Sequence, residues 1–131
     1  MREYKVSTLF GLPTVSSVLS GPKRGKQINF LFDTGSVVTQ VHIGTLHSLG
    51  FSFHDRQPDV SIRGVTGPVE DGFSLQVKRL FVLGRMFHDI TIAAFDLGEW
   101  AEEGIDGLLG FDLIRQFHVE MMGPEEVLRV Y

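Results

Sequence analysis

Turn-forming residues interrupt this 131-residue chain every few positions, and their spacing restricts the chain to short elements of secondary structure. Fifteen glycines and five prolines are spread along the sequence. Between them lie β-rich runs, such as residues 4–10, 27–32 and 90–95, that are typical of strands. Short strands at this spacing favour a barrel or a sandwich over alternating strand–helix units. The sequence therefore predicts an all-β fold.

Further runs predict the remaining strands and two short helices. The first helix is expected in residues 42–51, where Ile43, Leu46 and Leu49 share a face and Gly50 is a stop signal. The second is expected over residues 111–117, with Asp112 near its N-terminus. The other strands are expected at 14–19, 59–62, 69–73, 74–83, 118–122 and 127–131. No tandem repeat or linker divides the sequence, so we expect a single domain over residues 1–131.

Composition narrows the possible functions. A net charge of −4 argues against a dedicated nucleic-acid binder, which would usually be basic. The chain has no cysteine, which excludes disulfide and thiol chemistry and fits a reducing compartment. No run approaches the roughly eighteen apolar residues of a membrane helix, and the first ten residues lack a signal-peptide core. We therefore expect a cytoplasmic protein without a membrane segment or nucleic-acid partner. Its histidines do not have the spacing of a metal site.

The segment NFLFDTGSVVTQ, residues 29–40, places a carboxylate where the neighbouring residues suggest burial. A buried charge is costly unless it is paired, hydrogen-bonded or neutralised. Asp33, Thr34 and Gly35 could form an ordinary turn, because Asp can bond its own nearby backbone. Apolar runs on both sides predict an internal loop, which is uncommon because its polar groups need partners. Asp33 therefore either opens a turn or takes part in chemistry.

Two further patterns accompany this loop. Leu108, Leu109 and Gly110 precede the second predicted helix, and the glycine-rich sequence RGVTGP forms the tip of a predicted hairpin. Together with the Asp-Thr-Gly-Ser sequence, this arrangement resembles one lobe of an aspartic protease. At this length, the chain resembles the retropepsin-like branch, the single-lobe relatives of the retroviral proteases, over almost its whole sequence.

The resemblance implies a closed β-barrel of the retropepsin-like acid protease type, with one or two short helices. It also implies a homodimeric aspartic endopeptidase that acts on peptide or protein substrates without a metal or cofactor. Such enzymes activate a water between two carboxylates, which share a proton because both cannot easily ionise in contact. This chain has one such carboxylate, so each subunit would contribute Asp33 across a two-fold axis.

Individual roles follow from the same resemblance. Asp33 would be the catalytic carboxylate, and Thr34 would reach the partner's backbone across the dimer axis. Gly35 would let the substrate backbone approach, and Ser36 would hydrogen-bond the outer oxygen of Asp33. Leu108, Leu109 and Gly110 would pack beneath the loop. A flap that closes over the substrate would comprise Arg63, Gly64, Val65, Thr66 and Gly67.

The sequence also departs from the retroviral pattern. Retroviral members usually carry an Asp and an Arg that pair to brace the dimer, where this chain has Val37 and Phe111. The terminal segments 1–5 and 127–131 are expected to form an intersubunit sheet, as in retroviral relatives. Asp106 is a weaker alternative for the second carboxylate, and Trp100 is expected in the core. A non-catalytic protease-fold module for peptide binding or dimerisation is the alternative function.

Overall fold

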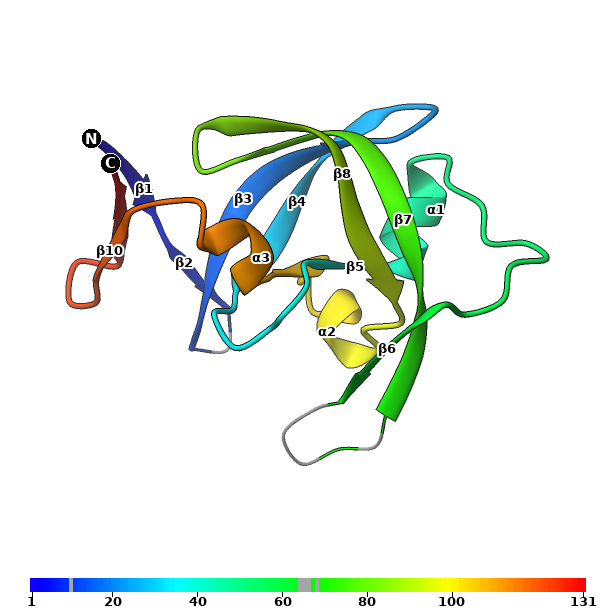
Figure 1. Cartoon of the computed structure of the whole chain (residues 1–131). Coiled ribbons are helices and arrows are strands. Elements are labelled where there is room, and N and C mark those ends of the chain that lie inside the picture. Colours follow the sequence, from blue (N-terminus) through cyan, green and yellow to red (C-terminus); the bar gives the residue numbers. More distant parts are fainter. Residues whose placement is uncertain (10, 64–66, 68) are drawn as a thin grey trace.

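The computed structural model describes residues 1–9, 11–63, 67 and 69–131, and more than half of them belong to strands (Figure 1). The elements, in chain order, are β1 (Arg2–Lys5), β2 (Ser7–Leu9), β3 (Leu12–Ser20), β4 (Gly25–Phe32), β5 (Gln40–His42), α1 (Ile43–Ser48), β6 (Val60–Arg63), β7 (Val69–Val82), β8 (Arg85–Phe95), α2 (Glu99–Glu102), β9 (Gly107–Leu109), α3 (Phe111–Ile114), β10 (Val119–Met122) and β11 (Val127–Val130). The prediction of a mainly β chain with short helices is confirmed. Among the described residues, no helix is long and apolar enough to cross a membrane.

The main sheet has eight strands in the order β2-β3-β4-β9-β5-β8-β7-β6. Two of its pairings are parallel, β4 with β9 and β5 with β8. An additional pairing joins β3 to β7, which lie far apart in that order, through Val18–Ser20 and Arg79–Phe81. The strand order alone does not establish a closed barrel, which stays a prediction.

The buried side chains of this sheet form a large part of the hydrophobic core. Side chains of β3 alternate, so that Val15, Ser17 and Leu19 are buried while Ser16 and Val18 face outward, as strand geometry requires. Phe30 on β4 and Leu109 on β9 are fully buried. Because these side chains are buried, they hold the ends of β4 and β9 in place. The Asp33 loop follows β4, and α3 follows β9.

Both predicted helices are present as α1 and α3, and a third helix, α2, lies in a segment for which no helix was predicted. α2 is a single turn whose first turn contains Glu99 and Glu102. Acidic side chains favour the start of a helix because they complement its dipole. Trp100 in α2 is 45% exposed, so the prediction that it belongs to the core is wrong.

Two predicted strands, at 69–73 and 74–83, form the single long strand β7. Its pairing with β8 continues through the predicted boundary, since Phe73 lies opposite Ala94 and Ser74 opposite Ala93. β7 also pairs with β6 to form the predicted hairpin, with Arg63 opposite Val69. β7 therefore runs as one strand from its hairpin with β6 to its turn with β8 (Figure 1).

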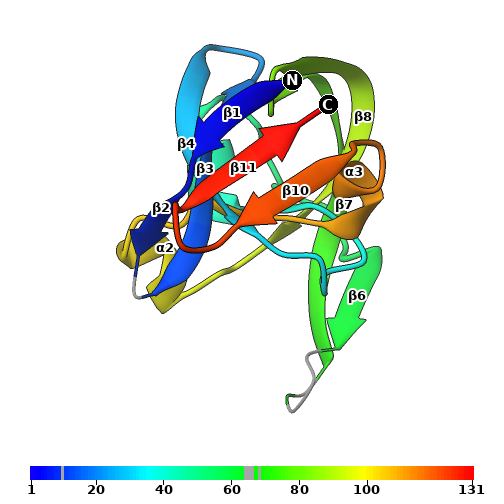
Figure 2. The same ribbon diagram turned by 90° about the vertical axis from the view of Figure 1, so that its left-hand side faces the viewer.

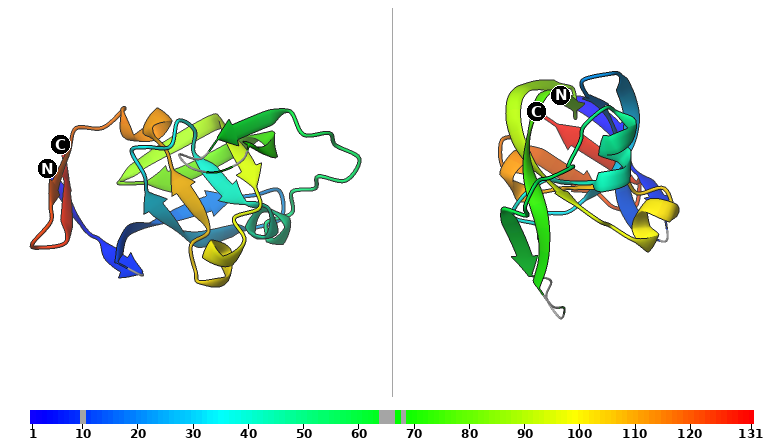
Figure 3. Two further views of the ribbon diagram at one scale, coloured as in Figure 1. Left: turned by 90° about the horizontal axis from the view of Figure 1, so that it is seen from below. Right: turned by 90° about the vertical axis from the view of Figure 1, so that its right-hand side faces the viewer.

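The two chain ends form a separate three-stranded sheet in the order β1-β11-β10 (Figure 2). Arg2 lies opposite Val130, and Val119 lies opposite the same residue on the other side of β11. Residues 1–5 and 127–131, which were expected to form a sheet between subunits, thus pair with each other within one chain. Every residue of β1 has an antiparallel partner in β11. This terminal sheet lies at one end of the molecule, and the loop between α1 and β6 lies at the other (Figure 3).

Candidate active site

The Asp33 loop begins where β4 ends. Phe32 lies opposite Leu109 in the parallel pairing of β4 with β9, and the Asp33 N–H then donates to the Leu109 carbonyl at 3.0 Å. Asp33 is half-buried. The buried ends of two strands thus fix the backbone that carries this carboxylate.

Short hydrogen bonds shape the loop itself. The Gly35 N–H donates to Oδ1 of Asp33 at 3.0 Å, and the Ser36 N–H donates to the Asp33 carbonyl at 3.2 Å. A Cβ added at Gly35 would lie 3.3 Å from Oδ1. A glycine therefore lets the backbone approach and orient the carboxylate.

Ser36 supports the loop in a different way from the one predicted. Its hydroxyl donates to the Val38 carbonyl at 2.8 Å and accepts a hydrogen bond from Nε2 of Gln40 at 3.1 Å. A hydroxyl has one proton to donate, and Val38 receives it. The predicted bond from Ser36 to Asp33 is therefore not formed in this structure.

A second group of bonds ties the loop to α3. Thr39 donates to Asp112 twice, from Oγ1 at 2.8 Å and from its backbone N–H at 3.1 Å. The Gly110 N–H donates to Thr39 Oγ1 at 3.0 Å, and the Phe111 N–H donates to the Ser36 carbonyl at 2.7 Å. Gly110 and Leu109 thus lie against the loop, and Leu108, predicted with them, lines the cavity beside Asp33. Sequence reasoning missed the roles of Thr39 and Asp112, because nothing in the sequence links residues 73 positions apart.

A cavity of about 460 Å³ opens beside the carboxylate. Its lining comes from the loop and from β5, β6 and β9: Asp33, Gly35, Ser36, Val37, Gln40, Ser61, Ile62, Arg63 and Leu108. The structure thus brings Arg63, one of the predicted flap residues, to the Asp33 loop. Gly64, Val65 and Thr66 lie outside the described residues, and Gly67 is exposed. Asp33 is the one carboxylate among these lining residues.

The family model described as Aspartyl protease matches residues 20–113, more than half of the chain and all of this site. The chain belongs to the aspartyl protease family. Its fold is that of the retropepsin-like members, as two solved structures show.

A retropepsin-like aspartic protease from Rickettsia conorii superimposes on this chain with a TM-score of 0.72. The match covers 98% of this chain and 89% of the other at 16% identity. The retroviral protease-like domain of Ddi1 from Leishmania major gives a TM-score of 0.58, covering 91% and 87% of the two chains at 14% identity. At these identities the likeness concerns the fold. Comparison with curated proteins gives no match.

Exposed apolar side chains lie around the Asp33 loop. We call Val37, Phe111 and Met121, with the exposed Thr34, the loop face. Val37 is 87% exposed and Phe111 48%, at the two positions where retroviral relatives carry the bracing pair. Both line a cavity of about 240 Å³ with Thr34, and Phe111 and Met121 line another of about 570 Å³. These two positions thus carry exposed apolar side chains, and the exposed Arg115 lines the same two cavities.

Asp106 has a structural role. Its Oδ2 accepts from the Asn29 N–H at 2.9 Å and its Oδ1 from the Thr45 hydroxyl at 3.0 Å. Both oxygens thus join β4 and α1 to the segment before β9. Asp106 does not line the Asp33 cavity, so it is not brought together with the predicted catalytic carboxylate. In the described part of the chain, no cluster of three or more potential ligands could hold a metal ion.

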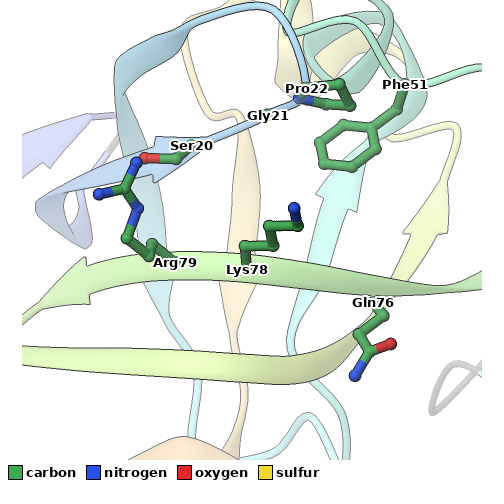
Figure 4. A pocket seen from close by; sticks show the side chains of 7 residues that line it. All are labelled: Ser20, Gly21, Pro22, Phe51, Gln76, Lys78 and Arg79. Carbon is green, nitrogen blue, oxygen red and sulfur yellow. The ribbon is translucent and has the colours of Figure 1, made fainter.

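A separate cavity of about 510 Å³ lies between the β3–β4 turn, β7 and the segment after α1 (Figure 4). Lys78 and Arg79 of β7 and Phe51 contribute to its walls, and no carboxylate lines it. It shares no lining residue with the Asp33 cavity. It is therefore not part of the candidate active site.

Proposed function

We propose that this chain is a single-domain, homodimeric aspartic endopeptidase in which Asp33 of one copy faces Asp33 of the other. The observation that carries the proposal is the Asp33 cavity, where one ordered carboxylate stands alone among the described lining residues. Hydrolysis by an aspartic protease needs two carboxylates that share a proton. A second copy supplies the missing group by symmetry.

In the proposed reaction, the ionised carboxylate takes a proton from a water molecule that attacks the peptide carbonyl carbon. The protonated carboxyl of the other copy donates its proton to the carbonyl oxygen. The first carboxyl then gives the proton that it took from water to the amide nitrogen, and the other carboxylate takes a hydroxyl proton from the tetrahedral intermediate. The peptide C–N bond breaks, the amine leaves, and the two carboxyl groups again share one proton. The Gly35 N–H at 3.0 Å from Oδ1 supports this role by holding the carboxylate in one orientation.

The loop face supports the dimer. Large apolar side chains that lie exposed around a functional loop are typical of a surface that another protein covers. Thr34 lies at this face and is exposed, as a residue that reaches the partner must be. We infer that a second copy covers it and that the strands close into a barrel joined by β3 and β7.

The substrate would lie extended between the Asp33 loop and the flap strand β6, bonded as an added strand. Ser61, Ile62 and Arg63 of β6 form that wall of the cavity. The flap of Arg63 to Gly67 would close over the peptide and exclude water. We expect this protease to act in the cytoplasm.

The test compares the wild type with Asp33→Asn on a diverse peptide pool, from acidic to neutral pH and over a range of protein concentrations. We expect cleavage by the wild type, with specific activity that rises with concentration, and none by the variant. Asp89→Asn is a matched control, because Asp89 has φ +50° and Asn tolerates that conformation well. It should cleave like the wild type.

The second candidate is a non-catalytic peptide-binding or dimerisation module. The position of the Ser36 hydroxyl favours it, since that group bonds Val38 and gives Asp33 no support. A folded dimer that binds peptides equally well with Asp33 or Asn, and cuts none at any pH, would establish this alternative and contradict the endopeptidase.

A further inference from the structure

The cavity of about 510 Å³ beside β7 gathers positive charge, and we call it the basic cavity (Figure 4). The Lys78 side chain extends from β7 toward Phe51, and the Arg79 side chain extends toward Ser20 (Figure 4). No carboxylate lines this cavity, and neither cation forms a salt bridge with a described residue. The chain as a whole has a net charge of −4, so the local charge is opposite in sign to that of the molecule.

A break in strand alternation brings these two cations together. Neighbouring side chains of a regular strand point to opposite faces, so Lys78 and Arg79 should point apart. Both are exposed, however, and they stand between the buried Val77 and Leu80. On β8, Asp89 lies between the partners of Val77 and Arg79 and has φ +50°. Both strands thus depart from regular geometry at the point where β7 presents two adjacent positive charges.

Backbone contacts hold the opposite wall of the basic cavity in place. The Gly21 N–H donates to the Arg24 carbonyl at 2.8 Å, and the Lys23 N–H donates to the carbonyl of Leu49, the C-cap of α1, at 3.0 Å. A Cβ added at Gly21 would collide with the Leu49 carbonyl oxygen, so the β3–β4 turn lies directly against the end of α1. A ligand would therefore enter a cavity that is already formed, without the cost of ordering its walls.

β7 also has an open edge beside this cavity. β6 pairs with the beginning of β7 and β3 pairs near its other end, which leaves residues 73–78 without a strand on that side. The N–H and carbonyl of Ser74 face this edge, because they bond the side chains of Asp59 and Arg56. Residues two apart in a strand face the same edge, so the N–H and carbonyl of Gln76 face it as well. In the part of the chain that the structure describes, no strand pairs with Gln76 there.

The charges of the neighbouring segments do not neutralise the basic cavity. Asp55 and Asp59, between α1 and β6, each lie beside a basic side chain of their own. Asp89 is on β8 and does not line the cavity. The β3–β4 turn adds two more exposed cations, Lys23 and Arg24. The surroundings therefore favour a negatively charged ligand.

We propose that the basic cavity and the open edge of β7 bind an extended acidic peptide segment of another protein. The peptide backbone would exchange hydrogen bonds with Gln76 as an added strand. Its Asp or Glu side chains would pair with Lys78 and Arg79, and an apolar side chain would pack against Phe51. A free anion would use neither the strand edge nor the aromatic wall. The basic cavity shares no lining residue with the Asp33 cavity, so this inference does not depend on the proposed function.

Peptide binding tests both the charge and the strand. The probe is a short peptide of alternating Glu and Val with a neutral dye, and fluorescence anisotropy gives its affinity for Asp33→Asn, in which the proposed cleavage is blocked. We expect this peptide to bind at least about tenfold more tightly than one of alternating Lys and Val. Methylation of alternate backbone nitrogens prevents strand addition and should weaken binding of the acidic peptide. Equal affinities of the acidic and basic peptides, or no effect of methylation, would overturn the proposal.

Variants assign the binding to the basic cavity. Lys78→Gln combined with Arg79→Gln should weaken binding of the acidic peptide about tenfold, because two exposed ion pairs are lost. Arg2→Gln combined with Lys5→Gln is the matched control, since it makes the same change of charge on β1. Arg63 is the cation that lines the Asp33 cavity, and Arg63→Gln should also leave binding unchanged. A loss of binding in Arg63→Gln alone would place the peptide in the Asp33 cavity and overturn the proposal.

Amide hydrogen exchange locates the bound peptide. The Gln76 N–H should exchange more slowly when the acidic peptide is present, whereas the amides of the terminal sheet should keep their rates. Unchanged exchange at Gln76 would overturn strand addition. Competition then separates the peptide from other anions. Displacement of the peptide by an equal concentration of inorganic phosphate, or tighter binding of a short oligonucleotide, would assign the cavity to a different ligand and overturn the proposal.

Discussion

At the residue scale, the Asp33 loop depends on side chains that lie outside the Asp-Thr-Gly-Ser sequence. Asp112 accepts two hydrogen bonds from Thr39, and Thr39 accepts one from the Gly110 backbone. Asp112 is half-buried, so water replaces these bonds poorly when they are lost. The positions of loop and helix are therefore coupled through one carboxylate.

Replacing Asp112 should loosen this coupling. We expect Asp112→Ala to lower the free energy of unfolding by about 1–3 kcal/mol, because it leaves two Thr39 donors without a partner. Urea unfolding monitored by circular dichroism measures the change. Glu125→Ala removes a carboxylate from an exposed turn and should change stability by less than about 0.5 kcal/mol. Equal effects of the two substitutions would contradict the role of Asp112.

Asp59 joins the segment before β6 to the long strand β7. Hydrogen bonds from the Ser74 hydroxyl and the Ser74 N–H, both at 2.6 Å, lower the pKa of Asp59 below its ordinary value of 3.8. The positive charge of Arg56 lowers this pKa further. A lowered pKa means that the contact stabilises the fold above pH 3.8 and is lost as the pH falls through the folded pKa.

An NMR titration of the Asp59 carboxyl carbon should therefore give a pKa below 3.8. Ser74→Ala removes the largest cause and should move the pKa upward, whereas Ser16→Ala, on β3, should leave it unchanged. A wild-type pKa of 3.8 or higher would show that these bonds do not favour the carboxylate form.

The residues of the Asp33 loop were predictable from the sequence, but the hydrogen-bond partners of their side chains were not. Asp33, Thr34 and Gly35 are recognisable because a turn sequence stands between apolar runs. The Ser36 hydroxyl was predicted to bond Asp33, yet it donates to Val38 and accepts from Gln40. Such choices depend on packing among segments that only the folded chain brings together.

At the element scale, α3 fits against the Asp33 loop through Gly110. This residue is the N-cap of α3, and a Cβ there would lie 2.6 Å from the Val38 carbonyl carbon and 2.8 Å from the Thr39 nitrogen. These neighbours are backbone atoms, so they cannot rotate away. A side chain at Gly110 would therefore force the Asp33 loop and α3 apart.

We therefore expect Gly110→Ala to destabilise the protein by about 1–3 kcal/mol, as overpacking usually does, and to reduce cleavage. Thermal unfolding and peptide cleavage are the measurements. Gly123→Ala is the matched control, because a Cβ at Gly123 has no atom within 4 Å. If Gly110→Ala is as stable and active as this control, the loop is free to move and the close approach has no consequence.

Most elements were predictable because turn residues separate runs with strand character. The errors occur where tertiary contacts decide. β7 continues through the predicted break because β8 pairs with it on both sides. β9 was recognised as an apolar step but not as a parallel partner of β4, since the pairing joins residues far apart in the chain. The one-turn helix α2 has too few residues to show a helical period.

At the scale of the whole molecule, the loop face predicts a dimer held by apolar contacts. Val37→Asp would place a carboxylate on this face in each copy. We expect it to weaken dimerisation at least tenfold, because the cost of taking a charge out of water can exceed its attraction to a cation, here Arg115 in the same cavity. Adding Phe111→Arg to the same chain should restore part of the affinity, since both positions line one cavity.

Sedimentation velocity over a concentration series measures this dimerisation. Met86→Asp is the control, because Met86 is 43% exposed on β8 and lies outside the loop face. It should dimerise like the wild type. A Val37→Asp protein that dimerises with unchanged affinity, or a wild type that stays monomeric at all concentrations, would contradict the proposed interface.

The terminal sheet has a consequence for engineering. Because β1 and β11 are antiparallel neighbours, with Arg2 opposite Val130, a few added residues could join Tyr131 to Met1 as an ordinary hairpin. New ends could then be opened in the exposed turn at Pro22–Arg24, which connects β3 to β4. Such a circular permutant would keep the Asp33 loop intact while carrying a fused reporter at a different corner of the fold.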